Sequence, residues 1–377
     1  MKIVVAPDSF KGSLSAKKIC DIVENVSNKL FEEVEVVKVP MADGGEGTVD
    51  SLTETLKADI INIEVKNPLG KPILATYGIF DKTKAVMEMA SASGITTVSD
   101  EERNVLEQNT FGTGEMILDA INRGVKTIYI GIGGSATNDG GIGMASAFGV
   151  KFLDENCKEL KPVPSNLNKI VTIDSTQLDS RIREIEIIIM CDVQNPLLGP
   201  EGATYVFGLQ KGITSENMQQ VEDGMEHYID LVETVLSVSV KNCPGAGAAG
   251  GLGAGMMAFT NATLKMGIQS IIEILEIEHK IKDADLVITG EGMMDSQSAY
   301  GKVASGIGGV AKKHQVPCIA IVGAMGKKAE VMYEHGITSI VTTVNGVMKL
   351  QEAIDCAAPL CYSAVERALR IYKINKK

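Results

Sequence analysis

Carboxylates and a lysine follow several apolar runs, at positions where buried strands are expected to end. Glu291, Asp295 and Lys302 share one polar segment after such a run. Magnesium is typically held by one or two carboxylates together with the phosphates of a substrate. The three side chains therefore indicate a magnesium–phosphate site, and the alternative is a surface loop with an ion pair.

A second acid, Asp192, comes shortly after the very apolar run 187–190. A carboxylate at the end of a buried strand is costly unless it has a partner. Metal ligation or acceptance of a proton from an alcohol would be suitable uses for it. The alternative is an Asp that only forms hydrogen bonds before the turn at Pro196.

Two N-terminal segments carry similar chemistry. Lys11 lies just past the first apolar run, in the segment DSFK, where a cation could neutralise phosphate oxygens. Ser9 or Ser13 could simply cap the next helix. In the segment DGGEG, Asp43 and Glu46 could contact a metal ion or a substrate hydroxyl. For Glu46 the alternative is a favourable place in the first turn of a helix.

The segment 131–143, GIGGSATNDGGIG, contains six glycines between a strand-like and a helix-like run. Glycines allow close approach of the backbone, and the free N–H groups of such a turn favour an anion. Ser135, Thr137 and Asn138 could add donors, and Asp139 could hold a cation. The segment predicts a phosphate or carboxylate site, with a ligand-free tight turn as the alternative.

A second glycine-rich segment, 244–255, contains the pattern G-x-G-x-x-G at Gly245, Gly247 and Gly250. This pattern is typical of a dinucleotide site only when a strand leads directly into it. Here the preceding residues end in Lys-Asn-Cys-Pro, so a flexible loop that covers a phosphate is an equally good interpretation. The chain has neither a Walker A sequence nor a G-x-S-x-G elbow.

Composition narrows the class of protein. The chain has 377 residues, a net charge of −12, 4% aromatic residues and no Trp, which argues against a nucleic-acid-binding surface. Its seven Cys contain no C-x-x-C pair and its four His are scattered, which argues against zinc. With no apparent signal peptide or membrane span, we expect a cytoplasmic protein with reduced thiols.

The order of elements predicts two α/β domains. Strand and helix alternate at both ends of the chain, which predicts a doubly wound parallel sheet. In between, the runs 73–79 and 85–89 predict an antiparallel hairpin. We therefore predict a discontinuous domain, 1–66 with 284–377, interrupted by an insertion, 67–283, with a mixed sheet. Ligands of open α/β sheets bind at the carboxyl ends of the strands, so we expect one crevice supplied by both domains.

Taken together, the motifs resemble those of the bacterial type I glycerate kinases, in order and over essentially the whole chain. The segments that carry the resemblance are APDSFKGSLSA (6–16), PMADGGEGTVDSL (40–52), MASASGI (89–95), TFGTGE (110–115), GIGGSATNDGG (131–141), CDVQNPLLGP (191–200), PGAGAAGGLGAG (244–255) and ITGEG…DSQS…GK (288–302). The resemblance implies a cytoplasmic enzyme that phosphorylates D-glycerate with ATP and Mg²⁺, more often to 2-phosphoglycerate than to 3-phosphoglycerate. It also implies a Rossmann-like domain interrupted by a second α/β domain.

On this basis either Asp43 or Asp192 is expected to deprotonate the attacking hydroxyl, with Lys11 stabilising the transferred group and Glu291 and Asp295 as candidate metal ligands. The residues expected to bind substrate or phosphate are Asp8, Ser9, Gly44, Gly45, Glu46, Ser91, Ser93, Gly133, Gly134, Ser135, Thr137, Asn138, Asn195, Gly247, Gly250 and Lys302.

The chain departs from the family pattern at Met293, where a basic residue often follows GEG, so Lys302, Lys11 or another cation must substitute for it. Two other functions remain open: an NAD-dependent dehydrogenase of a small hydroxy acid that uses Gly245–Gly250, and a non-catalytic sensor of a carboxylate metabolite. We expect a monomer or homodimer, with no nucleic-acid or membrane partner.

Overall fold

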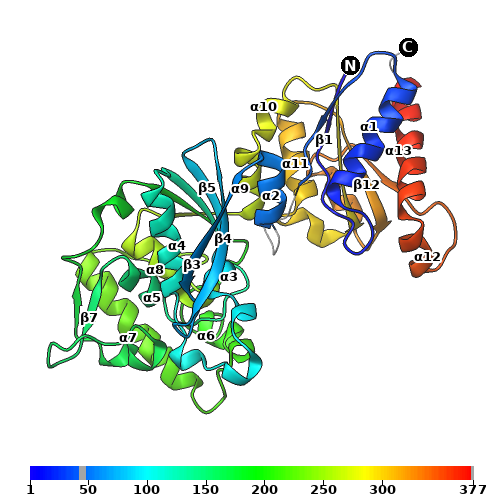
Figure 1. Cartoon of the computed structure of the whole chain (residues 1–377). Coiled ribbons are helices and arrows are strands. Elements are labelled where there is room, and N and C mark those ends of the chain that lie inside the picture. The colour runs from blue at the N-terminus through cyan, green and yellow to red at the C-terminus, as the bar shows by residue number, and fades with distance from the viewer. Residues whose placement is uncertain (42–47, 375–377) are drawn as a thin grey trace. The chain divides into compact units, whose positions relative to one another are not determined.

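The computed structural model describes residues 1–41 and 48–374 of the chain. The chain divides into two compact units, Met1–Thr55 with Gly267–Lys377, and Leu56–Met266 (Figure 1). Strand β3 (Asp59–Lys66) pairs with β4 (Pro72–Phe80) and so belongs to the second unit. These bounds differ from those read from the sequence, 66 and 283: β3 moves to the second unit at one junction, and the segment 267–283, which contains two helices, moves to the first unit at the other.

The first unit is built on a parallel sheet in the order β13-β12-β11-β1-β2. Its elements are β1 (Lys2–Val5), α1 (Ala16–Leu30), β2 (Glu35–Lys38), α2 (Thr48–Leu56), α9 (Gly267–Ile274), α10 (Ile277–Ile281), β11 (Leu286–Met294), α11 (Val303–Lys313), β12 (Cys318–Met325), β13 (Ser339–Thr342), α12 (Leu350–Asp355) and α13 (Ala357–Ile374). The buried apolar strands β1, β11 and β12 are typical of a sheet covered on both faces.

Helix α1 illustrates how the sequence dictates a local element. Ser15 caps its N-terminus by accepting a hydrogen bond from the backbone N–H of Lys18 at 3.2 Å. Ile19, Val23 and Val26 recur at helical spacing and are fully buried. This apolar side packs in the core that also contains residues of α13, so that the two ends of the chain lie side by side (Figure 1, blue and red).

Strand β1 lies between β2 and β11, so the chain reverses its direction across the sheet at β1 and β11. Such a topological switch point is where doubly wound folds place ligands. Two hydrogen bonds join the segment that follows β1 to residues within β11: the N–H of Asp8 donates to the carbonyl of Gly290 at 2.9 Å. The hydroxyl of Thr289 donates to the carbonyl of Ala6 at 2.8 Å. The polar ends of β1 and β11 are therefore adjacent.

The second unit contains a mixed sheet in the order β10-β9-β6-β5-β4-β3. Its elements are β3 and β4, then β5 (Lys84–Glu88), α3 (Ala90–Ser93), α4 (Phe111–Asn122), β6 (Thr127–Gly131), α5 (Ile142–Ala147), β7 (Lys151–Leu153), β8 (Thr172–Asp174), β9 (Glu186–Met190), α6 (Ala203–Phe207), α7 (Met218–Leu236), α8 (Ala248–Phe259) and β10 (Thr263–Lys265). Strands β4 and β5 pair antiparallel, which confirms the predicted hairpin, and β5, β6, β9 and β10 pair in parallel.

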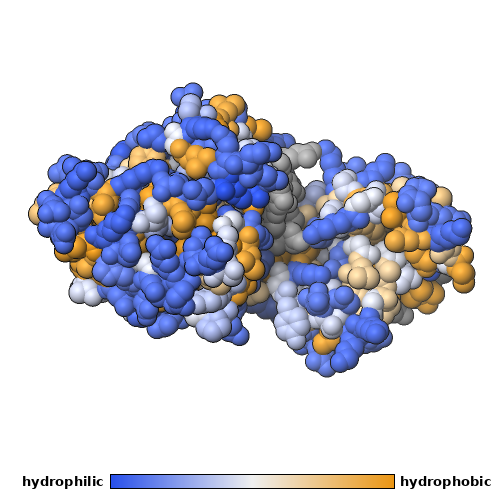
Figure 2. Space-filling view, turned by 90° about the horizontal axis from the view of Figure 1, so that it is seen from below, coloured by the Kyte–Doolittle hydropathy of each residue, from blue (hydrophilic) through white to orange (hydrophobic). Residues whose placement is uncertain are grey.

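Hydrophobic side chains are concentrated in the cores of the two units. Hydrophilic residues cover most of the face seen in Figure 2, and hydrophobic ones form small groups on it. Within the described residues, no helix is both long enough and apolar enough to cross a bilayer.

Candidate active site

The switch point of the first unit brings Asp8, Glu291 and Lys302 together. Glu291 lies in β11, and its Oε2 is 3.8 Å from Nζ of Lys302, the residue that precedes α11. Its carboxyl group is mostly buried, and no described residue forms a hydrogen bond with its Oε1. Asp8 accepts a hydrogen bond from the backbone N–H of Ser9 at 2.7 Å. The arrangement combines two acids and one lysine beside a pair of adjacent strand ends.

Burial raises the pKa of Glu291. A hydrogen bond from Ser298 and the charge of Lys302 oppose this shift, whereas Asp8 and Asp295 add to it through like charge. A buried carboxylate oxygen without a partner is a group that a cation would satisfy. Glu291 therefore fits a role as a ligand of a hard cation such as magnesium.

Asp295 has a local structural role. Its Oδ1 accepts a hydrogen bond from the backbone N–H of Gln297 at 2.8 Å, and its own N–H donates to Ser298 Oγ at 3.1 Å, which forms a capping box at the 3₁₀ helix Ser296–Ala299. In the part of the chain that the structure describes, no group of three or more His, Cys, Asp or Glu side chains is arranged to hold a metal ion. A metal ion here would depend on ligands beyond these carboxylates.

Lys11 and Met293 lie on the exposed side of this region. Gly292 brings β11 close to the segment after β1, because a Cβ at this position would lie 3.4 Å from Phe10 Cα and 3.6 Å from the backbone N of Lys11. Met293, the departure from the family pattern, is 57% exposed. Lys302 is thus a cation that contacts Glu291, and the backbone of Lys11 lies beside the same strand, β11.

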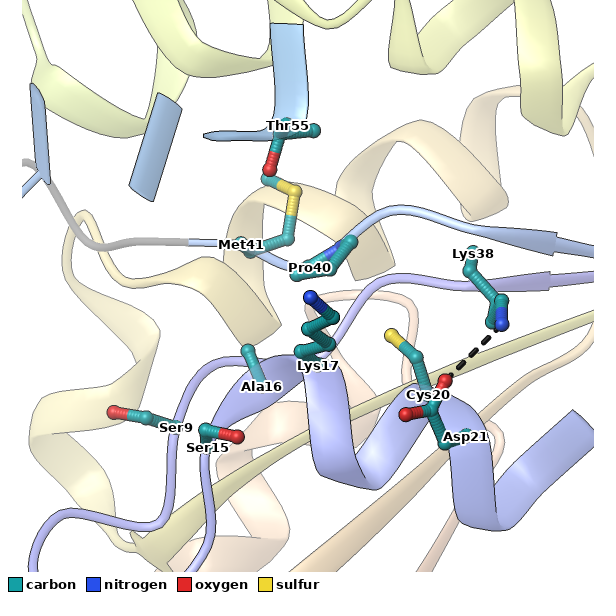
Figure 3. A pocket seen from close by; sticks show the side chains of 10 residues that line it. All are labelled: Ser9, Ser15, Ala16, Lys17, Cys20, Asp21, Lys38, Pro40, Met41 and Thr55. Carbon is teal, nitrogen blue, oxygen red and sulfur yellow. Dashed lines mark hydrogen bonds and ion pairs between the residues drawn. The ribbon is translucent and has the colours of Figure 1, made fainter. Parts of the chain in front are cut away.

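A cavity of about 520 Å³ lies beside α1, next to the segments that follow β1 and β2 (Figure 3). Figure 3 shows Lys17 extending toward Pro40 and Met41, with Thr55 beyond Met41. Lys38 forms ion pairs with Asp21 at 3.0 Å and with Glu24 at 2.7 Å. Among the described residues, the lining consists of Ser9, Ser15, Ala16, Lys17, Cys20, Asp21, Lys38, Pro40, Met41 and Thr55. Its size and its mixture of apolar and polar groups are typical of a small-ligand pocket.

In the second unit, the glycine-rich segment 131–143 follows β6, as predicted, but the expectation that Asp139 holds a cation is wrong. Asp139 is fully buried, and its carboxylate accepts hydrogen bonds from Thr110 N and Oγ1 and from the N–H groups of Gly141 and Gly143, all between 2.8 and 3.2 Å. These four donors occupy both oxygens, so Asp139 holds the loop in its fold.

The same loop is contacted by a lysine that sequence reasoning missed, at the end of the 3₁₀ helix Leu209–Lys211. Lys211 is only 2% exposed, and its Nζ donates hydrogen bonds of 2.7 Å to Ser135 Oγ and to the carbonyl oxygen of Thr137. Burial lowers its pKa to about 7, although the negative charge of Asp139 acts in the opposite direction. Ser135 and Lys211 are 76 positions apart in the chain, and no sequence motif connects them.

The predicted binding residues of the loop differ in exposure. Gly133 and Gly134 are exposed, whereas Thr137 and Asn138 are fully buried. In the described structure, neither Thr137 Oγ1 nor Asn138 Oδ1 has a hydrogen-bond partner. The exposed rim of the loop therefore lies at Gly133–Gly134, ahead of the buried part.

Helix α3 lies beside this rim. Gly94, which follows the helix, forms a backbone bridge with Ser135, and the N–H of Ile95 donates to the carbonyl of Gly134 at 2.9 Å. Ser93 Oγ is bonded to Thr113 Oγ1 at 2.8 Å, and Ser91 Oγ accepts from the N–H of Thr76 at 2.8 Å. The two predicted serines thus hold α3 in place, and through it they support the glycine-rich loop.

The second glycine-rich segment lies in the interior of the second unit, which overturns its interpretation as a flexible covering loop. The backbone N–H of Gly247 donates to the carbonyl of Asn195 at 3.0 Å, and that of Gly140 donates to the carbonyl of Gly250 at 2.9 Å. A Cβ at Gly250 would lie 2.1 Å from the carbonyl oxygen of Thr137. No strand leads into this segment, so its context is not that of a dinucleotide site.

The remaining predicted residues lie apart from these contacts. Asp192 is exposed after β9, whose residue Met190 pairs with Gly131 of β6, so the segments after both strands leave the same edge of the sheet. The Asn195 side chain donates to the carbonyl of Glu201 at 2.7 Å. Asp43, Gly44, Gly45 and Glu46 lie outside the described residues.

A doubly wound unit with carboxylates and a lysine at its switch point, joined in one chain to a unit with a glycine-rich loop, is the arrangement of an α/β protein that binds a small anionic ligand. The chain belongs to the glycerate kinase family, whose model matches residues 3–373. It is therefore a kinase, and ATP is its expected phosphoryl donor.

Individual relatives agree with this assignment over nearly their whole length. The glycerate kinase of Bacillus subtilis (strain 168) is 44% identical over 359 residues, which cover 95% of this chain and 94% of the relative. The glycerate 2-kinase of Escherichia coli (strain K12) is 44% identical over 94% of this chain and 93% of its own. A crystal structure from Salmonella typhimurium LT2, assigned as glycerate kinase 2, matches with a TM-score of 0.88 at 38% identity, covering 100% of this chain and 99% of that one.

Proposed function

We propose that this chain phosphorylates D-glycerate with MgATP and that the product is 2-phosphoglycerate. The observation that carries the proposal is the pair of Glu291 and Lys302 beside Asp8, at the switch point of a doubly wound unit. The choice of the 2-hydroxyl is supported by the likeness to the glycerate 2-kinase of Escherichia coli.

Phosphoryl transfer depends on positioning and on neutralisation of the charge on the transferred group. Glu291 is the proposed protein ligand of magnesium, with Asp295 acting directly or through water. A magnesium ion held there would supply positive charge to the phosphate oxygens. Lys302 and Lys11 are the proposed protein cations that contact the same oxygens.

The acceptor hydroxyl must lose its proton while its oxygen forms a bond to the γ-phosphorus. The bond between that phosphorus and the β,γ-bridging oxygen breaks, and ADP leaves with the electron pair. Asp43 or Asp192 would accept the proton. If replacing each of them in turn with Asn lowers kcat by less than about tenfold, neither is the base, since general base catalysis typically contributes more than this.

The cavity beside α1 is the proposed site for the nucleoside part of ATP. It adjoins the ends of β1 and β2 and combines apolar groups such as Ala16 and Met41 with hydroxyls and a lysine. The variant Ala16→Leu adds bulk inside the cavity and should raise the KM for ATP but not that for D-glycerate. Lys18→Leu, on the same helix but outside the cavity lining, is the matched control.

The direct test is a coupled ATP assay with D-glycerate, followed by NMR of the product to locate the phosphate. The assay is repeated with EDTA and after restoration of Mg²⁺. The proposal requires ADP formation that depends on both D-glycerate and a divalent cation. Absence of turnover with D-glycerate, or a phosphate on the 3-hydroxyl, would contradict the corresponding part of the proposal.

A further inference from the structure

The hydrogen bonds of Lys211 indicate that this buried side chain has a role besides packing. Its ammonium group is buried with two good acceptors, Ser135 Oγ and the Thr137 carbonyl, both at 2.7 Å. Burying an ammonium group is costly even when it is hydrogen-bonded. An apolar side chain of similar length would pack at this position without that cost, so the charge itself needs an explanation.

The hydrogen bond to Ser135 determines what that hydroxyl can do. A lysine ammonium has donors only, whereas a serine hydroxyl has one donor and two acceptor positions. When Lys211 is protonated it donates to Ser135 Oγ, which leaves the O–H of Ser135 available for another acceptor. Ser135 itself retains 8% exposure, next to the exposed Gly134. Lys211 thus polarises and orients a hydroxyl at the edge of the solvent.

The backbone beside this hydroxyl is open. None of the described residues accepts a hydrogen bond from the N–H of Gly133, Gly134 or Ser135. A Cβ at Gly133 would meet nothing within 4 Å, so this part of the loop faces open space. Gly134 has a φ of +70°, a conformation that glycine adopts at little cost. Successive free amides of this kind form anion-binding concavities.

The charge distribution around Lys211 agrees with an anion on the solvent side. Asp139 is the acid whose charge acts on Lys211, and its carboxylate is already engaged by four donors. The buried ammonium can therefore act on a second negative charge beyond Ser135. Burial lowers the pKa of Lys211 to about 7, and a nearby anion would favour the charged form of this side chain.

We infer that Ser135, with the amides of Gly133 and Gly134, binds an oxyanion of a substrate. Lys211 is the positioning residue: it contacts Ser135 from the buried side and adds positive charge to the site. The inference rests on the proposed function, because that function supplies the two candidate oxyanions. One is the carboxylate of the hydroxy acid and the other is a phosphate group of the nucleotide.

Steady-state kinetics test the inference and identify the anion. The variants are Lys211→Met and Ser135→Ala, with Lys158→Met as a control for loss of an exposed lysine in the same unit. Loss of one hydrogen bond to a charged group should raise the KM of one substrate by about tenfold or more. A rise for D-glycerate identifies the carboxylate, and a rise for ATP identifies a phosphate. Unchanged values for both substrates would overturn the inference.

Calorimetric binding separates this inference from the proposed function, because it needs no turnover. D-glycerate, inorganic phosphate and uncharged glycerol are titrated into the wild type and each variant. We expect an anion, but not glycerol, to bind to the wild type and to bind far more weakly to Lys211→Met. Equal anion binding by the wild type and Lys211→Met would refute it, whether or not the enzyme phosphorylates D-glycerate. If circular dichroism shows that Lys211→Met is unfolded, Ser135→Ala decides by the same criterion.

Discussion

The carboxylate of Glu291 lies 3.8 Å from the ammonium group of Lys302, while its Oε1 is buried without a hydrogen-bond partner among the described residues. A half-satisfied carboxylate in a buried position destabilises the free protein. This cost suggests that Glu291 is retained for its charge, and stability and activity should therefore respond in opposite directions when that charge is removed.

We expect Glu291→Gln to lower kcat by about a hundredfold, because a weaker metal site leaves less positive charge beside the transferred group, and loss of one electrostatic contact to a transition state costs roughly 2.7–4 kcal/mol. The same variant should be at least as stable as the wild type at pH 7.5. The folded-state pKa of Glu291 is raised, so its contribution to stability is present at low pH and is lost as pH rises through that pKa. Urea unfolding over a series of pH values up to 7.5 should show that the advantage of Gln grows as the pH rises. A variant with full activity would exclude Glu291 from the metal site.

Lys211 should make stability depend on pH in the opposite sense. Its pKa falls from 10.5 to about 7 on folding, so between these values the unfolded chain binds more protons and stability increases with pH. From pH 6.5 to pH 8 the gain from this group is about 1 kcal/mol by linkage. Urea unfolding of the wild type and Lys211→Met should show this slope in the wild type alone. Asp139, the acid whose charge acts on Lys211, is present in both proteins and so does not account for a difference between them. If the free energy of unfolding depends on pH equally in both proteins, Lys211 stays charged in the fold.

Gly133→Ala tests whether a ligand approaches the backbone of the loop. The new methyl group meets no protein atom within 4 Å, so the variant should fold with nearly unchanged stability. We nevertheless expect a higher KM for whichever substrate binds there, because the methyl group would displace the anion. Gly309→Ala in α11, where a Cβ also has open space, is the control and should keep both KM values. If Gly133→Ala also keeps them, no ligand contacts this residue.

Gly250→Ala distinguishes packing from ligand binding in the second glycine-rich segment. Gly250 has a φ of +67°, and its Cβ would lie 2.1 Å from the Thr137 carbonyl oxygen. Strain and overpacking together should cost about 3 kcal/mol or more in thermal or urea unfolding. Gly199→Ala, with a φ of +86° and nothing within 4 Å, carries the strain without the clash and should cost about 1–2 kcal/mol. If the two variants lose the same free energy of unfolding, the contact between the new Cβ at position 250 and the Thr137 carbonyl is relieved without cost.

The switch-point residues could be found from the sequence because the signal is local. Glu291 and Lys302 follow a strongly apolar run, and a doubly wound sheet places such strand ends on one edge. The hairpin at β4 and β5 was visible for the same reason, as two apolar runs separated by a short polar turn. The role of Asp295 is harder to predict from the sequence, because a capping acid and a metal ligand have the same sequence signature.

Two interpretations of the glycine-rich segments failed for a common reason. Asp139 was expected to hold a cation, but its four donors include groups at Thr110, which is 29 positions away in the chain. Gly250 was placed in a flexible loop, although its neighbour in space is Thr137. Neither partner could be identified from the residues around Asp139 or Gly250.

The sequence by itself determined the class of fold, the family and the strand ends at which polar side chains gather, because apolar periodicity and motif order are properties of neighbouring residues. Only the tertiary structure decided which of those polar groups are satisfied and which remain available. Lys211 and Ser135 show why: burial, hydrogen bonding and the resulting pKa depend on contacts between residues 76 positions apart, which only the folded chain brings together.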